Sequence, residues 1–234
     1  MKNKALFAWS GGKDSALALY EITRQQETDI AALLTTVTEG YDRISMHGVR
    51  RELLAAQAEA LSYPLEEVCI PPQCTNELYE QRMQQALEKY RQVGVTHTIF
   101  GDLFLAEVRA YREERLSRIG MHGIFPLWGS NTSDLARQFI QLGFRAVVVC
   151  VDATVLGGTF VGREYDEKFL GDLPDEVDPC GENGEFHTFV HAGPIFRHSI
   201  PIEHGEQVLR EERFYDCDLI STIETCASFS SPDL

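Results

Sequence analysis

Basic residues are scarce in this chain. Its 234 residues include 21 Lys and Arg against 36 Asp and Glu, and the formal net charge is −15. A protein of this charge is a poor candidate for binding along DNA or RNA, where Lys and Arg must neutralise phosphates. We therefore expect no nucleic-acid partner unless a local basic patch supplies a binding surface.

Long apolar runs are also missing. The first one, residues 5–9, stops at Ser10 and is too short for the core of a secretory signal. No stretch approaches the roughly 20 apolar residues of a membrane-spanning helix. The six cysteines include no C-x-x-C pair, so neither a zinc ribbon nor a thioredoxin-type site is supported. We expect a cytoplasmic protein with reduced cysteines and no membrane partner.

The acidic residues that dominate the charge are unevenly distributed. Residues 1–128 carry 14 basic and 17 acidic residues, whereas residues 129–234 carry 7 basic and 19 acidic ones. The net charges are therefore −3 and −12. This asymmetry indicates two parts with different tasks, and we place a domain boundary after Trp128.

Short apolar runs alternate with amphipathic stretches throughout residues 1–128. Such alternation is typical of α/β domains with a parallel, doubly wound sheet. We expect five strands, over residues 4–9, 30–37, 65–70, 96–101 and 124–128. The helices expected between them cover residues 15–25, 49–61, 76–93 and 103–119, with Asn76 capping the third helix.

The second half has fewer regular patterns. A helix is expected over residues 132–142, capped by Ser130, Asn131 or Thr132, and a fully buried strand over residues 146–151. Residues 157–193 are rich in Gly, Asp and Glu and have little periodicity, which fits either loops around a site or structure that the pattern does not reveal. The tail after Thr225 is expected to be loose.

A glycine-rich segment joins the first expected strand to the first expected helix. Its sequence is Ser10-Gly11-Gly12-Lys13-Asp14-Ser15. At such a junction free backbone N–H groups and the helix dipole favour an anion, and glycines let a phosphate approach the backbone. The segment is not a Walker A loop, because Phe7 and Asp14 stand where that pattern needs Gly and Ser or Thr. It indicates a polyphosphate site, with an ordinary glycine-rich turn as the less favoured alternative.

Two other polar clusters attract attention. Gly101 and Asp102 end the fourth expected strand, where ligands of open α/β folds bind, although Asp102 also suits a helix cap. Residues 178–188 read Asp-Pro-Cys-Gly-Glu-Asn-Gly-Glu-Phe-His-Thr, and the glycines permit a tight turn that aims polar groups at a ligand. A solvated acidic loop is the alternative. Glu182, Glu185 and His187 can also be interpreted as metal ligands, but no further spaced ligands support a closed site.

These segments resemble known sequences. The Ser10 to Ser15 segment resembles the PP-loop of the N-type ATP pyrophosphatases, in the adenine nucleotide alpha hydrolase-like superfamily. The set as a whole resembles the diphthine–ammonia ligase family of diphthamide synthesis, in particular its bacterial relatives. The matching pieces are the PP-loop, Met46-His47-Gly48-Val49-Arg50, Gly101-Asp102, residues 125–128, Leu156-Gly157, Phe160-Val161-Gly162-Arg163 and Gly181-Glu182-Asn183-Gly184-Glu185-Phe186-His187-Thr188. They run in order across nearly the whole chain.

The resemblance implies a Rossmann-like PP-loop ATP-binding domain, residues 1–128, and a smaller α+β substrate-binding domain, residues 129–234. It implies that ATP activates a carboxylate as an acyl-adenylate with loss of pyrophosphate, and that ammonia then displaces AMP. ATP and Mg²⁺ are the implied cofactors, with Mg²⁺ on the phosphates near Asp14. The implied nucleotide-binding residues are Ser10, Gly11, Gly12, Lys13, Asp14, Ser15, Gly101 and Asp102. The catalytic candidates are Lys13, Asp14, Glu182, Glu185 and His187, and the substrate-binding candidates are Glu182, Asn183 and Glu185.

The second substrate and two other functions stay open. Diphthine on elongation factor 2 is one candidate acid, and a corrinoid-related small acid is another. A tRNA-thiolating PP-loop ATPase is the main rival enzyme, which the missing cysteine pair and the acidic second half disfavour. A module that binds ATP or AMP without turnover is the rival from another class. The sequence does not decide whether the chain is a homo-oligomer.

Overall fold

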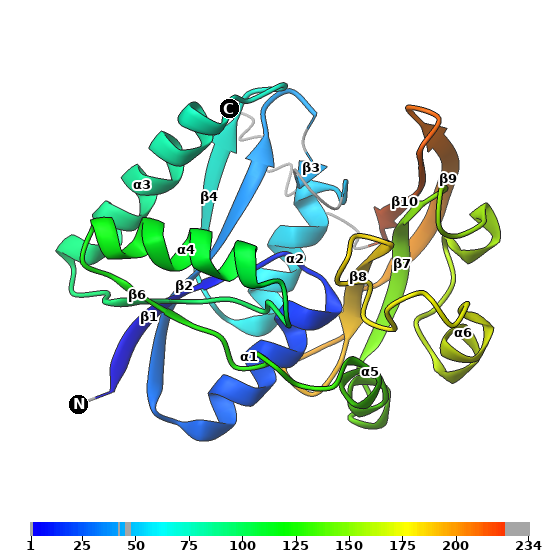
Figure 1. Cartoon of the computed structure of the whole chain (residues 1–234), viewed down its shortest axis with the longest axis horizontal. Helices are drawn as coiled ribbons and strands as arrows, with labels where there is room; N and C mark the ends of the chain where they lie inside the picture. Colours follow the sequence, from blue (N-terminus) through cyan, green and yellow to red (C-terminus); the bar gives the residue numbers. More distant parts are fainter. Residues whose placement is uncertain (1, 42, 45–47, 223–234) are drawn as a thin grey trace, which may run out of the picture.

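The first of two β-sheets lies in the N-terminal half. The computed structural model describes residues 2–41, 43–44 and 48–222 (Figure 1). Sheet A consists of β1 (Asn3–Ala8), β2 (Thr28–Thr38), β3 (Arg43–Ile44), β4 (Leu65–Ile70), β5 (His97–Ile99) and β6 (His122–Ile124). Its parallel strands run in the order β4-β2-β1-β5-β6, and β3 pairs antiparallel with the end of β2. The predicted parallel five-stranded arrangement is confirmed.

Helices pack on both faces of sheet A. They are α1 (Lys13–Gln25), α2 (Arg51–Leu61), α3 (Asn76–Gln92) and α4 (Ala106–Arg118). Side chains of β1 alternate between the faces, so Phe7 joins a core with α1 and α2, whereas Leu6 joins a core with α3 and α4. This double winding is the predicted one, and it leaves the carboxyl ends of the strands open for a ligand.

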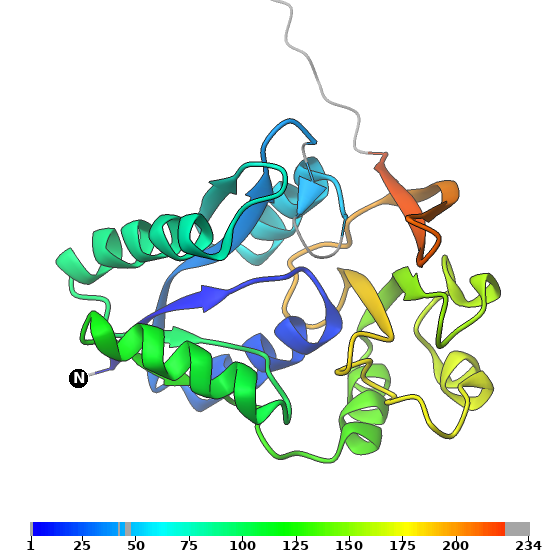
Figure 2. The ribbon, with the colours of Figure 1, turned by 45° about the horizontal axis from the view of Figure 1, so that its top comes forward.

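The second sheet is antiparallel and lies beside sheet A (Figure 2). Sheet B has the strand order β8-β7-β10-β9, with β8 at one edge. The elements of this half are α5 (Thr132–Gln141), β7 (Arg145–Asp152), η1 (Gly158–Phe160), α6 (Glu167–Asp172), β8 (Phe186–Ala192), β9 (Ile202–Arg210) and β10 (Phe214–Ser221). The α+β character expected of the C-terminal part is thus confirmed, and the boundary after Trp128 stays a prediction.

Several local predictions need correction. The strand expected over residues 124–128 is instead β6 at His122–Ile124, because Pro126 cannot donate to a ladder and begins a turn. The cap of α3 is Thr75, whose hydroxyl accepts the N–H of Leu78 at 3.3 Å, and not Asn76. Asn131 is the cap of α5. Met46, His47 and the tail after Thr225 lie outside the described residues.

The helices show no sign of a membrane segment. Within residues 2–41, 43–44 and 48–222, none is long and apolar enough to cross a bilayer.

Candidate active site

A cavity of about 500 Å³ opens at the carboxyl ends of the sheet A strands. Its wall combines the β1–α1 loop, the ends of β2 and β5, α3, and residues 180–188 from the C-terminal half. Ten predicted site residues lie in it: Ser10, Gly12, Lys13, Asp14, Ser15, Gly101, Asp102, Glu182, Asn183 and His187. The topology therefore brings the three polar clusters of the sequence to one place.

The PP-loop, residues 10–15, has the backbone of an anion-binding turn. Gly11 has φ +79°, a conformation that favours glycine, and α1 then starts at Lys13, whose N–H donates to the Thr188 hydroxyl because the N-cap residue Gly12 has no side chain to accept it. The hydroxyl of Ser15 donates to the carbonyl of Gly12 at 2.8 Å and lies 3.1 Å from that of Ser10. The first turn of α1, with two hydroxyls beside it, is suited to phosphate oxygens.

Lys13 links the PP-loop to the C-terminal half. Its side chain is 4% exposed, and its Nζ donates to the carbonyl oxygen of Cys180 and to the carboxylate of Asp14. The same ammonium lies 5.7 and 5.4 Å from the ring centres of Tyr165 and Phe186. Burial lowers the pKa of Lys13, but the Asp14 carboxylate and further negative groups outweigh burial and raise that pKa. The lysine is therefore a cation held at the junction of the two halves.

Three acid–base groups surround this lysine. Burial raises the pKa of Asp14, and the attraction of Lys13 offsets only part of that effect. Burial also raises the pKa of Glu182 to about 7, although its carboxylate accepts the backbone N–H of Leu103 at 2.8 Å. Burial and the Lys13 charge lower the pKa of His187 to about 4. At neutral pH the imidazole is uncharged, whereas both the protonated and the ionised form of Glu182 are present.

Gly101 and Asp102 contact the rest of the site in different ways. A Cβ on Gly101 would lie 3.0 Å from backbone atoms of Asp14 and Ser15, so only glycine lets this strand end approach the PP-loop. The carboxylate of Asp102 forms an ion pair of 2.7 Å with Arg112 on α4. The guanidinium of Arg112 lies 4.4 Å from the ring centre of Phe100. Arg112 and Phe100 are cavity residues that the sequence interpretation missed.

Glu185 occupies a structural position inside the 178–188 turn. It is 6% exposed and accepts the backbone N–H groups of Asp178 at 3.2 Å and Asn183 at 2.9 Å, as well as the Asn183 side-chain amide at 2.8 Å. The wall formed by the described residues includes Glu182, Asn183 and His187 but neither Glu185 nor Gly11. A catalytic role for Glu185 stays a prediction, and its contacts fix the shape of the turn.

The residues around the cavity offer Mg²⁺ few carboxylates. No group of three or more His, Cys, Asp or Glu in the described part of the chain is arranged to hold a metal ion by itself. The Asp14 side chain is 29% exposed and lies next to the PP-loop. Since Mg²⁺ on a nucleotide takes most of its ligands from phosphates and water, one such carboxylate fits it.

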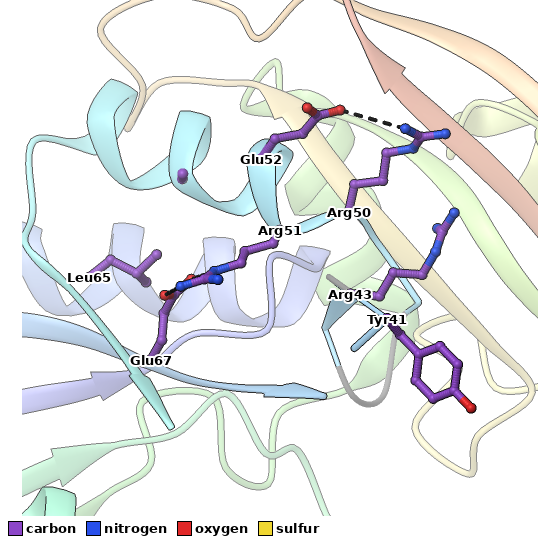
Figure 3. Close-up of a pocket in the computed structure, with 8 residues that line it drawn as sticks. Tyr41, Arg43, Arg50, Arg51, Glu52, Leu65 and Glu67 are labelled. Atoms are coloured by element: carbon purple, nitrogen blue, oxygen red, sulfur yellow. Dashed lines mark hydrogen bonds and ion pairs between the residues drawn. The ribbon is translucent and has the colours of Figure 1, made fainter. Parts of the chain in front are cut away.

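A second cavity, of about 730 Å³, is lined by three arginines beside sheet A: Arg43, Arg50 and Arg51 (Figure 3). Each arginine already has an acidic partner. Arg51 pairs with Glu67 of β4, and Arg43 and Arg50 both donate to Asp218 of β10, at 2.6 to 3.1 Å. Arg43 and Arg50 thus connect the N-terminal half to sheet B, and the charges of all three arginines are largely compensated.

Fold and site together define a class: an α/β protein with a glycine-rich, PP-loop-like turn at the strand ends and a second, antiparallel sheet in contact with that turn. Comparison with protein families gives the particular case. The diphthamide synthase N-terminal domain matches residues 1–123 and the diphthamide synthase C-terminal domain matches residues 131–222. The chain belongs to the diphthamide synthase family.

Similar individual proteins carry one common name. A diphthine–ammonia ligase of Schizosaccharomyces pombe is 26% identical over 223 residues, which are 88% of this chain and 37% of that protein. The diphthine–ammonia ligase of Mus musculus is 25% identical, over 86% of this chain and 83% of the relative. The protein of that name from Homo sapiens is 24% identical over the same shares. The chain thus spans most of the mammalian relatives and little more than a third of the yeast one.

Proposed function

We propose that this protein is an ATP-dependent amide ligase of the diphthine–ammonia ligase type. One observation carries the proposal: Lys13 of the PP-loop is in contact with the 178–188 turn, so that a phosphate site and an acid–base cluster share one cavity. The relatives named diphthine–ammonia ligase support the same activity. In the proposed reaction the substrate carboxylate attacks the α-phosphate of ATP, pyrophosphate leaves, and ammonia displaces AMP from the acyl-adenylate.

The PP-loop is proposed to hold the departing pyrophosphate. The backbone N–H groups at the start of α1 would be its donors, together with the Ser10 and Ser15 hydroxyls once these turn away from their partners within the loop, and Lys13 supplies a positive charge. Gly101 would permit the approach of β5, and Asp102 would face the nucleotide. These groups stabilise charge that grows as the α–β phosphate bond breaks.

Asp14 is proposed as the protein ligand of Mg²⁺. When bound, the ion would neutralise phosphate charge and favour the loss of pyrophosphate. The Asp14 carboxylate is the only acidic side chain of the PP-loop and borders the cavity.

The 178–188 turn is proposed to handle the amine. Ammonium must lose a proton before it can attack, and Glu182 has a pKa near 7 that suits proton transfer at neutral pH. His187 is uncharged there and can accept a hydrogen bond from ammonia, while Asn183 can orient the acyl group. Glu185 keeps these residues in place by holding the turn.

The acid is proposed to be diphthine on elongation factor 2, with a corrinoid-related acid as the alternative. Pyrophosphate release should be measured with ATP, Mg²⁺, ammonium and each acid in turn, and the amide product identified by mass spectrometry. Release with a diphthine-bearing factor supports the full proposal. Release only with a small acid would retain the reaction and change the substrate. ATP binding without release for any acid would favour a nucleotide-binding module.

A further inference from the structure

Gln57 of α2 is a buried polar side chain that the proposed chemistry does not use. It is 0% exposed in the middle of a helix that otherwise contributes aliphatic side chains to the core. Burying an amide requires that its hydrogen bonds be satisfied, since an unpaired buried donor or acceptor is costly. The partners of Gln57 therefore indicate what the amide is for.

All three partners of the Gln57 amide lie at the PP-loop or at sheet B. Its Oε1 accepts the indole N–H of Trp9 at 2.8 Å, one residue before the loop. Its Nε2 donates to the carbonyl oxygen of Gly11 at 3.0 Å and to that of Val190 in β8 at 2.7 Å. One side chain thus joins the start of the loop, the loop itself and the C-terminal sheet.

The edge of β8 contacts the same loop directly. The N–H of Val190 donates to the Gly11 carbonyl at 2.9 Å, and the Thr188 hydroxyl accepts the N–H of Lys13 at 3.0 Å. The Gly11 carbonyl therefore receives two hydrogen bonds from outside the loop. In a trans peptide the C=O and the next N–H point in opposite directions, so fixing the Gly11 carbonyl also fixes the N–H of Gly12 in the cavity wall, which donates to the Ser10 hydroxyl at 3.3 Å within the loop.

We propose that Gln57 is a positioning residue that, with the edge of β8, presets the Gly11–Gly12 peptide for phosphate binding. The nucleotide site is then completed by the C-terminal sheet and is not a property of the N-terminal half alone. The inference rests on the proposed function in one respect, namely that the PP-loop binds the phosphates of ATP. Preset N–H donors favour binding because no ordering cost is incurred when the ligand arrives.

The test uses the full chain and three variants. Gln57→Met keeps the volume of the side chain and removes its hydrogen bonds. Gln57→Glu keeps the shape, but an ionised carboxylate would face the two carbonyl oxygens of Gly11 and Val190. Leu61→Ala, in the last turn of the same helix, is the control for a loss of core stability without contact to the loop amide. The ATP dissociation constant is measured by calorimetry and the unfolding midpoint by heating without nucleotide.

We expect Gln57→Met to weaken ATP binding roughly tenfold or more, by a factor that does not change with pH. At low pH we expect Gln57→Glu to bind ATP about as tightly as the wild type, because a protonated carboxyl can donate to one of the two carbonyl oxygens. Burial raises the pKa of a carboxyl, so we expect the affinity to fall as pH rises between about 6 and 9 and the carboxyl ionises. Leu61→Ala should lower the unfolding midpoint and leave ATP affinity within about twofold. Because an ionised buried carboxylate also destabilises the fold, the unfolding midpoint of Gln57→Glu is measured at each pH, and a loss of affinity at a pH where the variant stays folded supports the positioning role.

Tryptophan fluorescence gives a second readout. The chain has two tryptophans, so Trp128→Phe leaves Trp9 as the reporter beside Gln57. In that background ATP should change the emission of Trp9, and Gln57→Met should remove most of the change.

Two results would overturn the inference. The first is an ATP affinity of Gln57→Met within about twofold of that of the wild type. The second is a loss of ATP affinity in Leu61→Ala that equals the loss in Gln57→Met when the two variants have the same unfolding midpoint. Both leave the proposed function standing, because the wild type still binds ATP. A wild-type chain that fails to bind ATP would instead remove the proposed function and this inference together.

Discussion

Lys13 has two sets of partners available to it, one in the protein and one in the proposed ligand. Its ammonium is paired with Asp14 and the Cys180 carbonyl and lies over the rings of Tyr165 and Phe186. In the proposed reaction a cation in that position stabilises the departing pyrophosphate. The contacts of the ammonium need its charge, whereas filling the buried space needs only the aliphatic stem.

Replacing Lys13 by Met separates charge from packing. We expect Lys13→Met to fold and to lower pyrophosphate release at least about 100-fold, which is typical for the loss of one charge-stabilising donor. Lys89→Met removes an exposed lysine of α3, which pairs with Glu66 of β4, and is the matched control. Pyrophosphate release at saturating ATP is the measurement, and a turnover equal to that of the control would contradict a catalytic role.

Glu182 and Glu185 are two carboxylates of one turn with different surroundings. Glu182 lies in the cavity wall, and its pKa is raised to about 7, chiefly by burial. If the ionised form accepts a proton from the amine, amide formation should rise as pH increases through about 7. Rates should be expressed per concentration of free ammonia, so that the titration of ammonium itself is removed from the profile.

The two matched substitutions distinguish these carboxylates. Glu182→Gln should lower the rate of amide formation and abolish the rise near pH 7. Glu185→Gln replaces an acceptor of three hydrogen bonds with a group that donates at one end, so we expect less amide product and unchanged ATP affinity. Retention of the rise in Glu182→Gln would show that another group titrates, and lost ATP affinity in Glu185→Gln would assign Glu185 to the nucleotide site.

At the scale of elements, Asp218 joins β10 of sheet B to Arg43 and Arg50 of the N-terminal half. Hydrogen bonds from Arg50 and Arg43 hold the pKa of Asp218 below its usual value. A lowered pKa means that the stabilisation is present above the pKa of the unfolded chain and is lost as pH falls through the folded value. Since the two arginines are 30% and 37% exposed, solvent screens part of this interaction.

Asp218→Asn should lower the free energy of unfolding by about 1 kcal/mol at neutral pH. Asp216→Asn is the control, because Asp216 lies on the same strand and pairs with Arg210 inside the β9–β10 hairpin. Urea unfolding at pH 7 and near pH 3 measures both. The difference between the variants should shrink at the lower pH, and an equal loss in both would mean that the connection between the halves contributes little.

The elements that the sequence predicted are those with a strong local pattern. β1, the PP-loop and α1 were recognisable because an apolar run, two glycines and an amphipathic helix follow one another. β9 was missed because its residues, such as Glu203, Glu206 and Arg210, are mostly exposed and leave no apolar run. β8 was missed for the opposite reason, since it is buried on both faces and carries His and Thr among its apolar residues.

The sequence predicted most of the residues at the site but not the partners that each of them contacts. The motif placed Glu182 and Glu185 together, but only the folded turn shows that one faces the cavity and the other its own backbone. The role of Gln57 could not be predicted because a glutamine in a helix normally lies on the solvent-exposed face. Its burial depends on partners in segments that are distant in sequence. Arg112 looked like one more charge of α4 until its pairing with Asp102 was known.

At the scale of the whole molecule, the acidic charge belongs to residues 129–234, whose net charge is −12. The diphthine side chain of the proposed substrate carries a quaternary ammonium, and an acidic surface attracts such a group at long range. The nucleotide half is near neutral and tolerates a polyphosphate.

Salt should therefore affect the second substrate. We expect KM for the diphthine-bearing factor to rise severalfold between low and physiological ionic strength, with kcat little changed, because screening weakens attraction between separated charges. An uncharged crowding solute of equal osmolality is the control. A KM that is insensitive to salt would mean that the acidic residues serve only solubility.

The hydrogen bond between Lys13 and Thr188 also has a consequence for the order of folding. Its partners are 175 residues apart, and so the PP-loop obtains its final contacts only after most of the chain has been synthesised. Contacts of such long range form late and slow the search for the native state. A nascent chain could thus build sheet A early yet have an incomplete nucleotide site, and ATP would act on it chiefly by slowing unfolding of the finished molecule.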